Sequence, residues 1–111
     1  MQTSNVSTVN NAVKLRARIK QEFWKVLPLI QINTEKSLEE ARRKLGFLYQ
    51  LIERFMVIEK KSLLKSDKIA LEYLQSQILH FLKEFEEISP TERLKTAKSL
   101  QRTAESTLET D

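Results

Sequence analysis

The side chain best suited to chemistry near neutral pH is His80, the single histidine of the sequence. One histidine without any cysteine cannot supply the paired ligands of a common protein metal site. The one glycine, Gly46, cannot form a glycine-rich phosphate loop, and a lone histidine specifies no nucleophile–base pair. We therefore expect a protein that is not an enzyme, with no catalytic residue, no cofactor and no metal site.

The residues that begin at His80 nevertheless resemble a known family. The run His80-Phe81-Leu82-Lys83 is similar to the His-x-Leu-Lys stretch of histidine phosphotransfer domains, which are also four-helix bundles. The resemblance implies an exposed His80 that carries a phosphoryl group, followed by small residues where a response regulator docks. Here Glu84-Phe85-Glu86 follow instead, and their bulk and negative charge oppose docking and phosphorylation. A solvent-facing histidine is expected, and a phosphotransfer relay is the third functional hypothesis.

Basic side chains recur on one face of each of two predicted helices, and no acid interrupts them. The first stripe, spaced i, i+4, i+7 and i+11, is Lys14, Arg18, Gln21 and Lys25. The second, spaced i, i+7, i+11 and i+18, is Arg43, Gln50, Arg54 and Lys61. Stabilising surface helices usually mix signs, so the six basic residues predict contact with phosphates or with an acidic partner. The alternative is an ordinary solvated basic face on a protein of net charge +4.

The segment 38–58 carries more apolar residues than one helical seam needs. Its apolar positions span about 200° of a helical wheel, whereas a bundle helix commonly needs little more than about 100°. Trp24 lies about 120° from the apolar stripe of its own segment, where it could anchor a partner. Unless other helices cover them, four residues predict a surface for a protein partner or a second copy of the chain: Trp24, Phe47, Leu51 and Ile58.

Long helices must position these side chains, because one glycine and two prolines in 111 residues leave few turns. Apolar periodicity predicts helices at about 10–31, 37–61, 67–88 and 90–108. Ser37 begins a capping-box pattern, with Asn33 and Thr34 as other candidate caps, and Ser89-Pro90-Thr91-Glu92 is a specific helix start. Pro28 should end or kink the first helix. Residues 1–9 are predicted to be a disordered polar tail, and 10–111 a single domain.

The expected fold is all-α, an antiparallel four-helix bundle, because short connections favour antiparallel neighbours. A helical hairpin that completes its core by dimerising is the alternative. The third helix should carry central core on the face that includes Phe81 and Phe85. The fourth helix should be the weakest, because its predicted seam of Leu94, Ala97, Gln101, Ala104 and Leu108 buries little apolar area.

The leading functional hypothesis is a non-enzymatic protein–protein interaction bundle, an adaptor or assembly factor that self-associates. The alternative is a nucleic-acid-binding accessory protein that uses the two basic stripes. In helix order and charge the chain resembles the small basic four-helix accessory proteins that serve the reverse transcriptases of diversity-generating elements. The longest apolar run, Phe55–Ile58, is too short to cross a membrane, and the lack of cysteine suits the cytoplasm. We therefore expect a cytoplasmic protein without a membrane partner.

Overall fold

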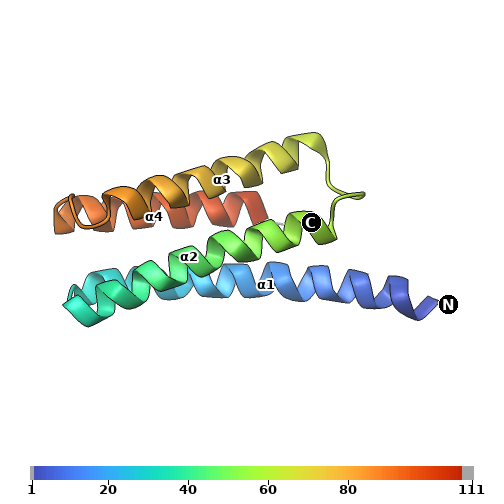
Figure 1. Cartoon of the computed structure of the whole chain (residues 1–111), viewed down its shortest axis with the longest axis horizontal. Coiled ribbons are helices and arrows are strands. Elements are labelled where there is room, and N and C mark those ends of the chain that lie inside the picture. The colour runs from blue at the N-terminus through green and yellow to red at the C-terminus, as the bar shows by residue number, and fades with distance from the viewer. Residues whose placement is uncertain (1, 109–111) are drawn as a thin grey trace.

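The computed structural model describes the backbone of residues 2–108 and the side chains of residues 12–108. Within this range it contains four helices and no strand: α1 (Gln2–Ile32), α2 (Glu35–Ile58), α3 (Lys65–Glu84) and α4 (Pro90–Leu108). The all-α class is therefore confirmed. In Figure 1 the chain runs along α1 to one end of the molecule, and each later helix runs back along the one before it.

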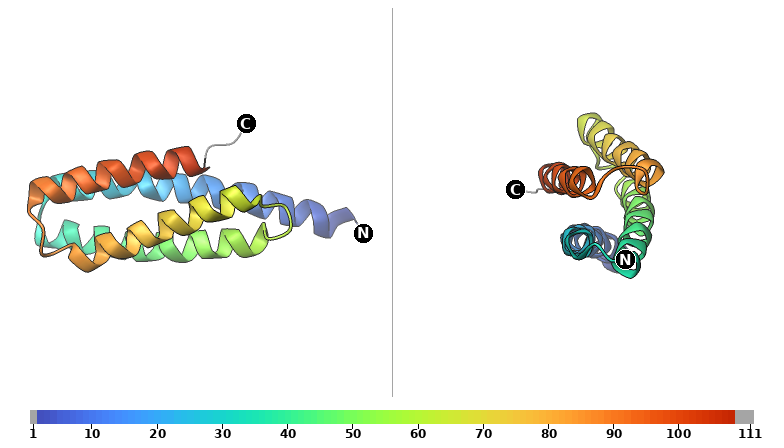
Figure 2. Two further views of the ribbon diagram at one scale, coloured as in Figure 1. Left: turned by 90° about the horizontal axis from the view of Figure 1, so that it is seen from above. Right: turned by 90° about the vertical axis from the view of Figure 1, so that its left-hand side faces the viewer.

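The helices surround a common centre, as the end-on view of Figure 2 shows. Helices α1 and α3 each pack against both α2 and α4. All four helices contribute to one apolar core. Its large, fully buried side chains include Ile19 from α1, Phe55 from α2 and Phe81 from α3. The predicted core face of α3, which carries Phe81 and Phe85, is confirmed because both rings are buried.

Helix α1 is longer than the sequence predicts. Residues 2–9, predicted to be a disordered tail, are helical, and residue 1 lies outside the described part of the chain. No glycine or proline in this stretch interrupts the helix. The helix also continues through Pro28 to Ile32. It ends at Asn33, whose φ of 56° is left-handed and reverses the chain.

Helices α2 and α3 each begin two residues before the predicted position, and α4 begins where it was predicted to begin. The N-cap of α2 is Thr34, one of the candidate caps, and Ser37 is its partner in a capping box. The Ser37 amide donates a hydrogen bond to Thr34 Oγ1 at 3.1 Å, and the Thr34 amide donates one to Ser37 Oγ at 2.9 Å. Helix α3 begins after Leu64, without a side-chain cap. Helix α4 begins at Pro90 as predicted, and Ser89 Oγ accepts a hydrogen bond from the Glu92 amide.

The buried face of α4 is rotated from its predicted position. The helix buries Arg93, Ala97, Leu100, Ala104 and Leu108, while Leu94 and Gln101 are only half-buried. Arg93 is only 7% exposed, and hydrogen bonds to backbone carbonyls account for the burial of this charged side chain. Its guanidinium donates to the carbonyl of Phe85 at 2.8 Å and to that of Ile88 at 3.2 Å, the two carbonyls that follow α3.

Arg93 also reaches across to the connection between α1 and α2. Its Nη1 donates to Asn33 Oδ1 at 3.4 Å, and its guanidinium carbon lies over the ring of Phe85, 5.1 Å from the centroid. One side chain therefore ties both connections at this end of the bundle together, and the cation offsets the negative end of the α3 dipole.

Within the described residues, each helix is too polar or too short in its apolar stretches to traverse a lipid bilayer.

Candidate functional site

The two predicted basic stripes meet in a groove between α1 and α2. Lys14 and Arg18 project from successive turns of α1, and Arg54 projects from α2 opposite them. Leu15 and Ile58 complete the lining of this space of about 380 Å³. Because α2 runs back along α1, the N-terminal part of one stripe faces the C-terminal part of the other (Figure 1). We call these five residues the basic groove.

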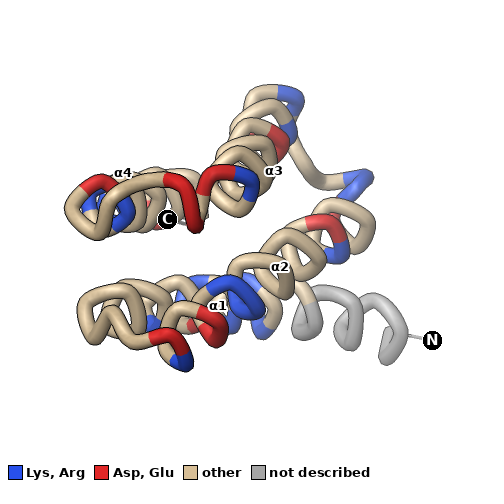
Figure 3. The backbone as a smooth tube through the Cα atoms, turned by 60° about the vertical axis from the view of Figure 1, so that its left-hand side comes forward, with Lys and Arg blue, Asp and Glu red and all other residues tan. Residues whose placement is uncertain are grey.

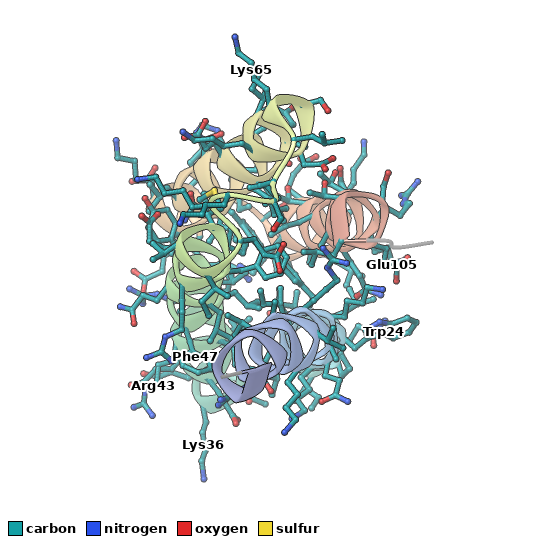
Figure 4. The ribbon with its side chains drawn as sticks, turned by 90° about the vertical axis from the view of Figure 1, so that its right-hand side faces the viewer. Trp24, Lys36, Arg43, Phe47, Lys65 and Glu105 are labelled. Carbon is teal, nitrogen blue, oxygen red and sulfur yellow. The ribbon has the colours of Figure 1, made fainter. Side chains whose placement is uncertain are left out.

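A cation–π contact holds one wall of the basic groove. The guanidinium carbon of Arg18 lies over the ring of Phe47, 5.0 Å from its centroid, where the ring quadrupole attracts the cation. Figure 4 shows Phe47 at the junction of α1 and α2. The ring is 37% exposed, so it supports the arginine from the edge of the core. Phe47 therefore places the Arg18 charge beside the groove and restricts its motion.

The charges of the basic groove are not neutralised by neighbours. No acid lines it, and none of Lys14, Arg18 and Arg54 has an ion pair within residues 12–108. Figure 3 shows Lys and Arg segments on both α1 and α2. Three like charges above an apolar floor repel one another, and a bound anion relieves that repulsion.

Lys25, predicted for the same stripe, is engaged elsewhere. Its Nζ and that of Lys44 each lie 3.1 Å from a carboxylate oxygen of Glu22. Burial raises the pKa of Glu22, but hydrogen bonds from Lys25 and Lys44, together with their charges, outweigh that effect and hold this pKa below its ordinary value. Glu22 is therefore ionised at neutral pH and offsets both lysines.

The remaining predicted basic residues also lie outside the basic groove. Arg43 pairs with Glu39 one turn earlier in α2, at 3.0 Å, on an exposed surface. Lys61 lies exposed in the connection between α2 and α3. The structure thus assembles half of the predicted set, Lys14, Arg18 and Arg54, into one site.

The predicted apolar partner surface is not assembled. Leu51 is only 3% exposed, so other parts of the bundle cover it and it offers no exposed surface to a partner. It lies one turn beyond Phe47 on α2 and belongs to the apolar core to which all four helices contribute. Ile58 is half-buried in the basic groove. Phe47 and Trp24 lie on opposite sides of α1 in Figure 4.

Trp24 is the largest exposed apolar side chain of the described residues. It is 59% exposed on the outer face of α1, where it borders a shallow groove of about 820 Å³. Pro28 and Leu29 of α1 and Lys44 of α2 line the same groove. It is separate from the basic groove, since the two share no lining residue.

His80 faces solvent, as predicted, with its side chain 72% exposed. Its Nε2 lies 3.4 Å from Glu84 Oε2, one turn along α3. Phe85 is in the core, as the predicted buried stripe of α3 requires, so its ring does not obstruct docking beside His80. The described residues contain no group of three or more histidine, cysteine or acidic side chains placed to hold a metal ion.

Two structural features were not predicted from the sequence. Arg93 was not predicted to be buried, although its spacing of four and seven residues from Ala97 and Leu100 places all three on one helical face. The support that Phe47 provides to Arg18 was also missed, because the contact joins two helices. No spacing rule within one helix could have identified it.

Comparison with known proteins gives this chain no relatives from which a role could be inferred: no family model matches it, and neither a curated protein nor a solved structure matches it.

Proposed function

We propose that this protein is a non-enzymatic nucleic-acid-binding protein, built on an antiparallel four-helix bundle, whose basic groove contacts the phosphate backbone. The observation that supports this proposal is the convergence of Lys14, Arg18 and Arg54 from two helices in a recess that no described acid lines. Lys14 and Arg18 were predicted from the stripe on α1 and Arg54 from the stripe on α2, and the groove is lined by residues of both helices. A nucleic-acid backbone presents several phosphates in a row, so more than one can contact the three basic residues, whereas a single carboxylate presents one anion.

Salt dependence should identify such contacts. Each phosphate neutralised by a basic side chain releases a counterion, so the logarithm of the affinity falls with the logarithm of salt concentration. For three contacts the slope is about −2 to −3. The combined variant Lys14→Gln, Arg18→Gln and Arg54→Gln should reduce the magnitude of that slope by about 2–3 and weaken binding at low salt. Fluorescence anisotropy of a labelled oligonucleotide over a salt titration measures both quantities.

A matched variant separates the groove from the net charge. Lys36→Gln, Lys65→Gln and Arg102→Gln remove the same charge from exposed positions on α2, α3 and α4, and Figure 4 shows Lys36 and Lys65 projecting away from the bundle. This control should keep most of the wild-type slope. Equal losses in the two variants would contradict a localised site, and wild-type protein that binds no oligonucleotide at micromolar concentration and low salt would refute the proposal.

A second candidate function, self-association, is favoured by the exposure of Trp24. A tryptophan at the edge of an 820 Å³ groove can bury its ring in a partner copy at little entropic cost. The buried Leu51 no longer supports such an interface on α2.

Sedimentation of the wild-type protein should then show a mass that rises with concentration above 13.0 kDa. Trp24→Glu should return the mass to that of a monomer at every concentration, because it places a charge in the apolar contact. Trp24 is the one tryptophan of the sequence, so its emission should also shift to shorter wavelength as the dimer forms. A wild-type protein that remains monomeric at high concentration would exclude this function.

A further inference from the structure

The lining of the basic groove combines charge with apolar and planar groups. Lys14 and Arg54 provide charge, while Leu15 and Ile58 provide an apolar floor. Arg18 provides a guanidinium plane that Phe47 supports from one side. A site that held phosphate alone would gain nothing from the apolar floor, since phosphate and sugar are polar. The composition therefore suits a ligand that presents an anion and an apolar face together.

An unpaired nucleotide is such a ligand. In a duplex the faces of the bases are stacked inside and only phosphates, sugars and base edges reach a protein. In a single strand the base faces are available, and proteins stack them on aromatic side chains or on arginine planes. The volume of about 380 Å³ is at the small end of the range of about 300–1,000 Å³ typical of small-ligand pockets. This space lies open at the surface along α1 and α2, where a single nucleotide can rest against both helices; a duplex presents a convex surface instead.

We infer that the basic groove binds single-stranded nucleic acid, with a base stacked on Arg18 and the adjacent phosphates held by Lys14 and Arg54; this inference rests on the proposed function. Phe47 is a positioning residue in this arrangement. The guanidinium carbon of Arg18 lies over the Phe47 ring, 5.0 Å from its centroid, and in the proposed arrangement the base stacks on the side of the guanidinium away from that ring. The stacked order is then Phe47, Arg18 and base, with the cation between two π systems.

Arg18→Lys tests the stacking directly, because lysine keeps the charge but lacks the plane. Affinity for a single-stranded oligonucleotide should fall roughly 5- to 100-fold, the usual effect of losing one stacked base. Affinity for a duplex of the same sequence should change little. Arg54→Lys is the matched control, since it makes the same chemical change in the same groove at a residue that only contacts phosphate. It should reduce single-strand affinity by about twofold or less.

Phe47→Leu tests the support of the guanidinium while Arg18 is retained. It should lower single-strand affinity in the same direction as Arg18→Lys, with no further loss when the two changes are combined. Circular dichroism verifies that each variant is folded. A single strand with 2-aminopurine supplies an independent signal, because the fluorescence of this base falls when it stacks. The fall should be smaller with Arg18→Lys than with Arg54→Lys.

The possible results separate the inference from the proposed function. Tighter binding of the single strand, lost on Arg18→Lys and kept on Arg54→Lys, supports the stacking site. Equal affinity for single strand and duplex, with equal effects of the two lysine variants, overturns the inference but leaves phosphate binding in place. The absence of binding to either form, at low salt and micromolar protein, overturns both.

Discussion

Phe81→Ala is expected to lower the free energy of unfolding by roughly 3–5 kcal/mol, the usual cost of truncating a buried phenylalanine. The Phe81 ring is 1% exposed and lies 5.1 Å from the ring of Phe85, centroid to centroid. Truncation removes the apolar contacts of the ring and leaves a cavity that neighbouring side chains fill only in part. A domain of this size is held by about 5–15 kcal/mol, so the variant should be partly unfolded under mild stress.

The adjacent position provides the control. His80→Ala should change the unfolding free energy by no more than about 0.5 kcal/mol, because surface substitutions away from special contacts have small effects. Its one described ion-pair contact, to Glu84, joins exposed groups. Urea unfolding followed by circular dichroism measures both variants. A severe loss for His80→Ala together with tolerance of Phe81→Ala would mean that the buried face of α3 is assigned the wrong way round.

Arg93→Met should cost about 2–4 kcal/mol of unfolding free energy, although methionine fills much of the same volume. The substitution leaves the carbonyls of Phe85 and Ile88 without the donor that reaches them at 2.8 and 3.2 Å. Buried acceptors left unpaired cost about 1–3 kcal/mol each, and hydrogen bonds from charged groups are worth about 1.5–3 kcal/mol. Part of this cost is recovered wherever water reaches the carbonyls.

Arg93→Lys separates the charge from the geometry. Lysine retains the cation at the end of α3 but cannot donate along the separate directions that the guanidinium serves. In urea titrations the unfolding free energy of the Arg93→Lys variant should lie between that of the wild-type protein and that of Arg93→Met. If Arg93→Met were as stable as wild type, the connection between α3 and α4 would be held by its apolar contacts alone, and the guanidinium would have no structural part.

Apolar periodicity was enough to predict the four helices, because a stripe repeated every three or four residues can be buried only as a helix. The ends of the helices were harder to predict from the sequence. Thr34 and Ser37 are equally good caps as residue types, and only the backbone geometry decides that Thr34 caps while Ser37 bonds back to it. Helix α3 has no side-chain cap at all, so no residue type marks its start at Lys65.

The basic groove could be predicted in part. Each stripe follows from spacing within one helix, but the pairing of Arg54 with Lys14 and Arg18 depends on how far α2 is shifted along α1. The many side-chain contacts that set this shift are not visible in either segment alone. The width of a buried face is similarly a property of pairs of helices. Leu51 was therefore predicted for a partner surface, although it is buried within the bundle.

The order in which the helices contact one another has a consequence for folding. Helices that follow one another in the chain, α1 with α2, α2 with α3 and α3 with α4, form their contacts by closing short loops. The contact between α1 and α4 alone joins segments distant in the chain, and α4 has two alanines on its buried face. Helix α4 should therefore dock last and detach first during local opening.

The basic groove is formed by α1 and α2 alone. Brief detachment of α4 would therefore expose part of the core, while Lys14, Arg18 and Arg54 remain on two helices that still pack against each other. If the basic groove binds a ligand as proposed, opening at α4 and ligand contact at α1 and α2 involve different helices, so the protein would open without releasing its ligand.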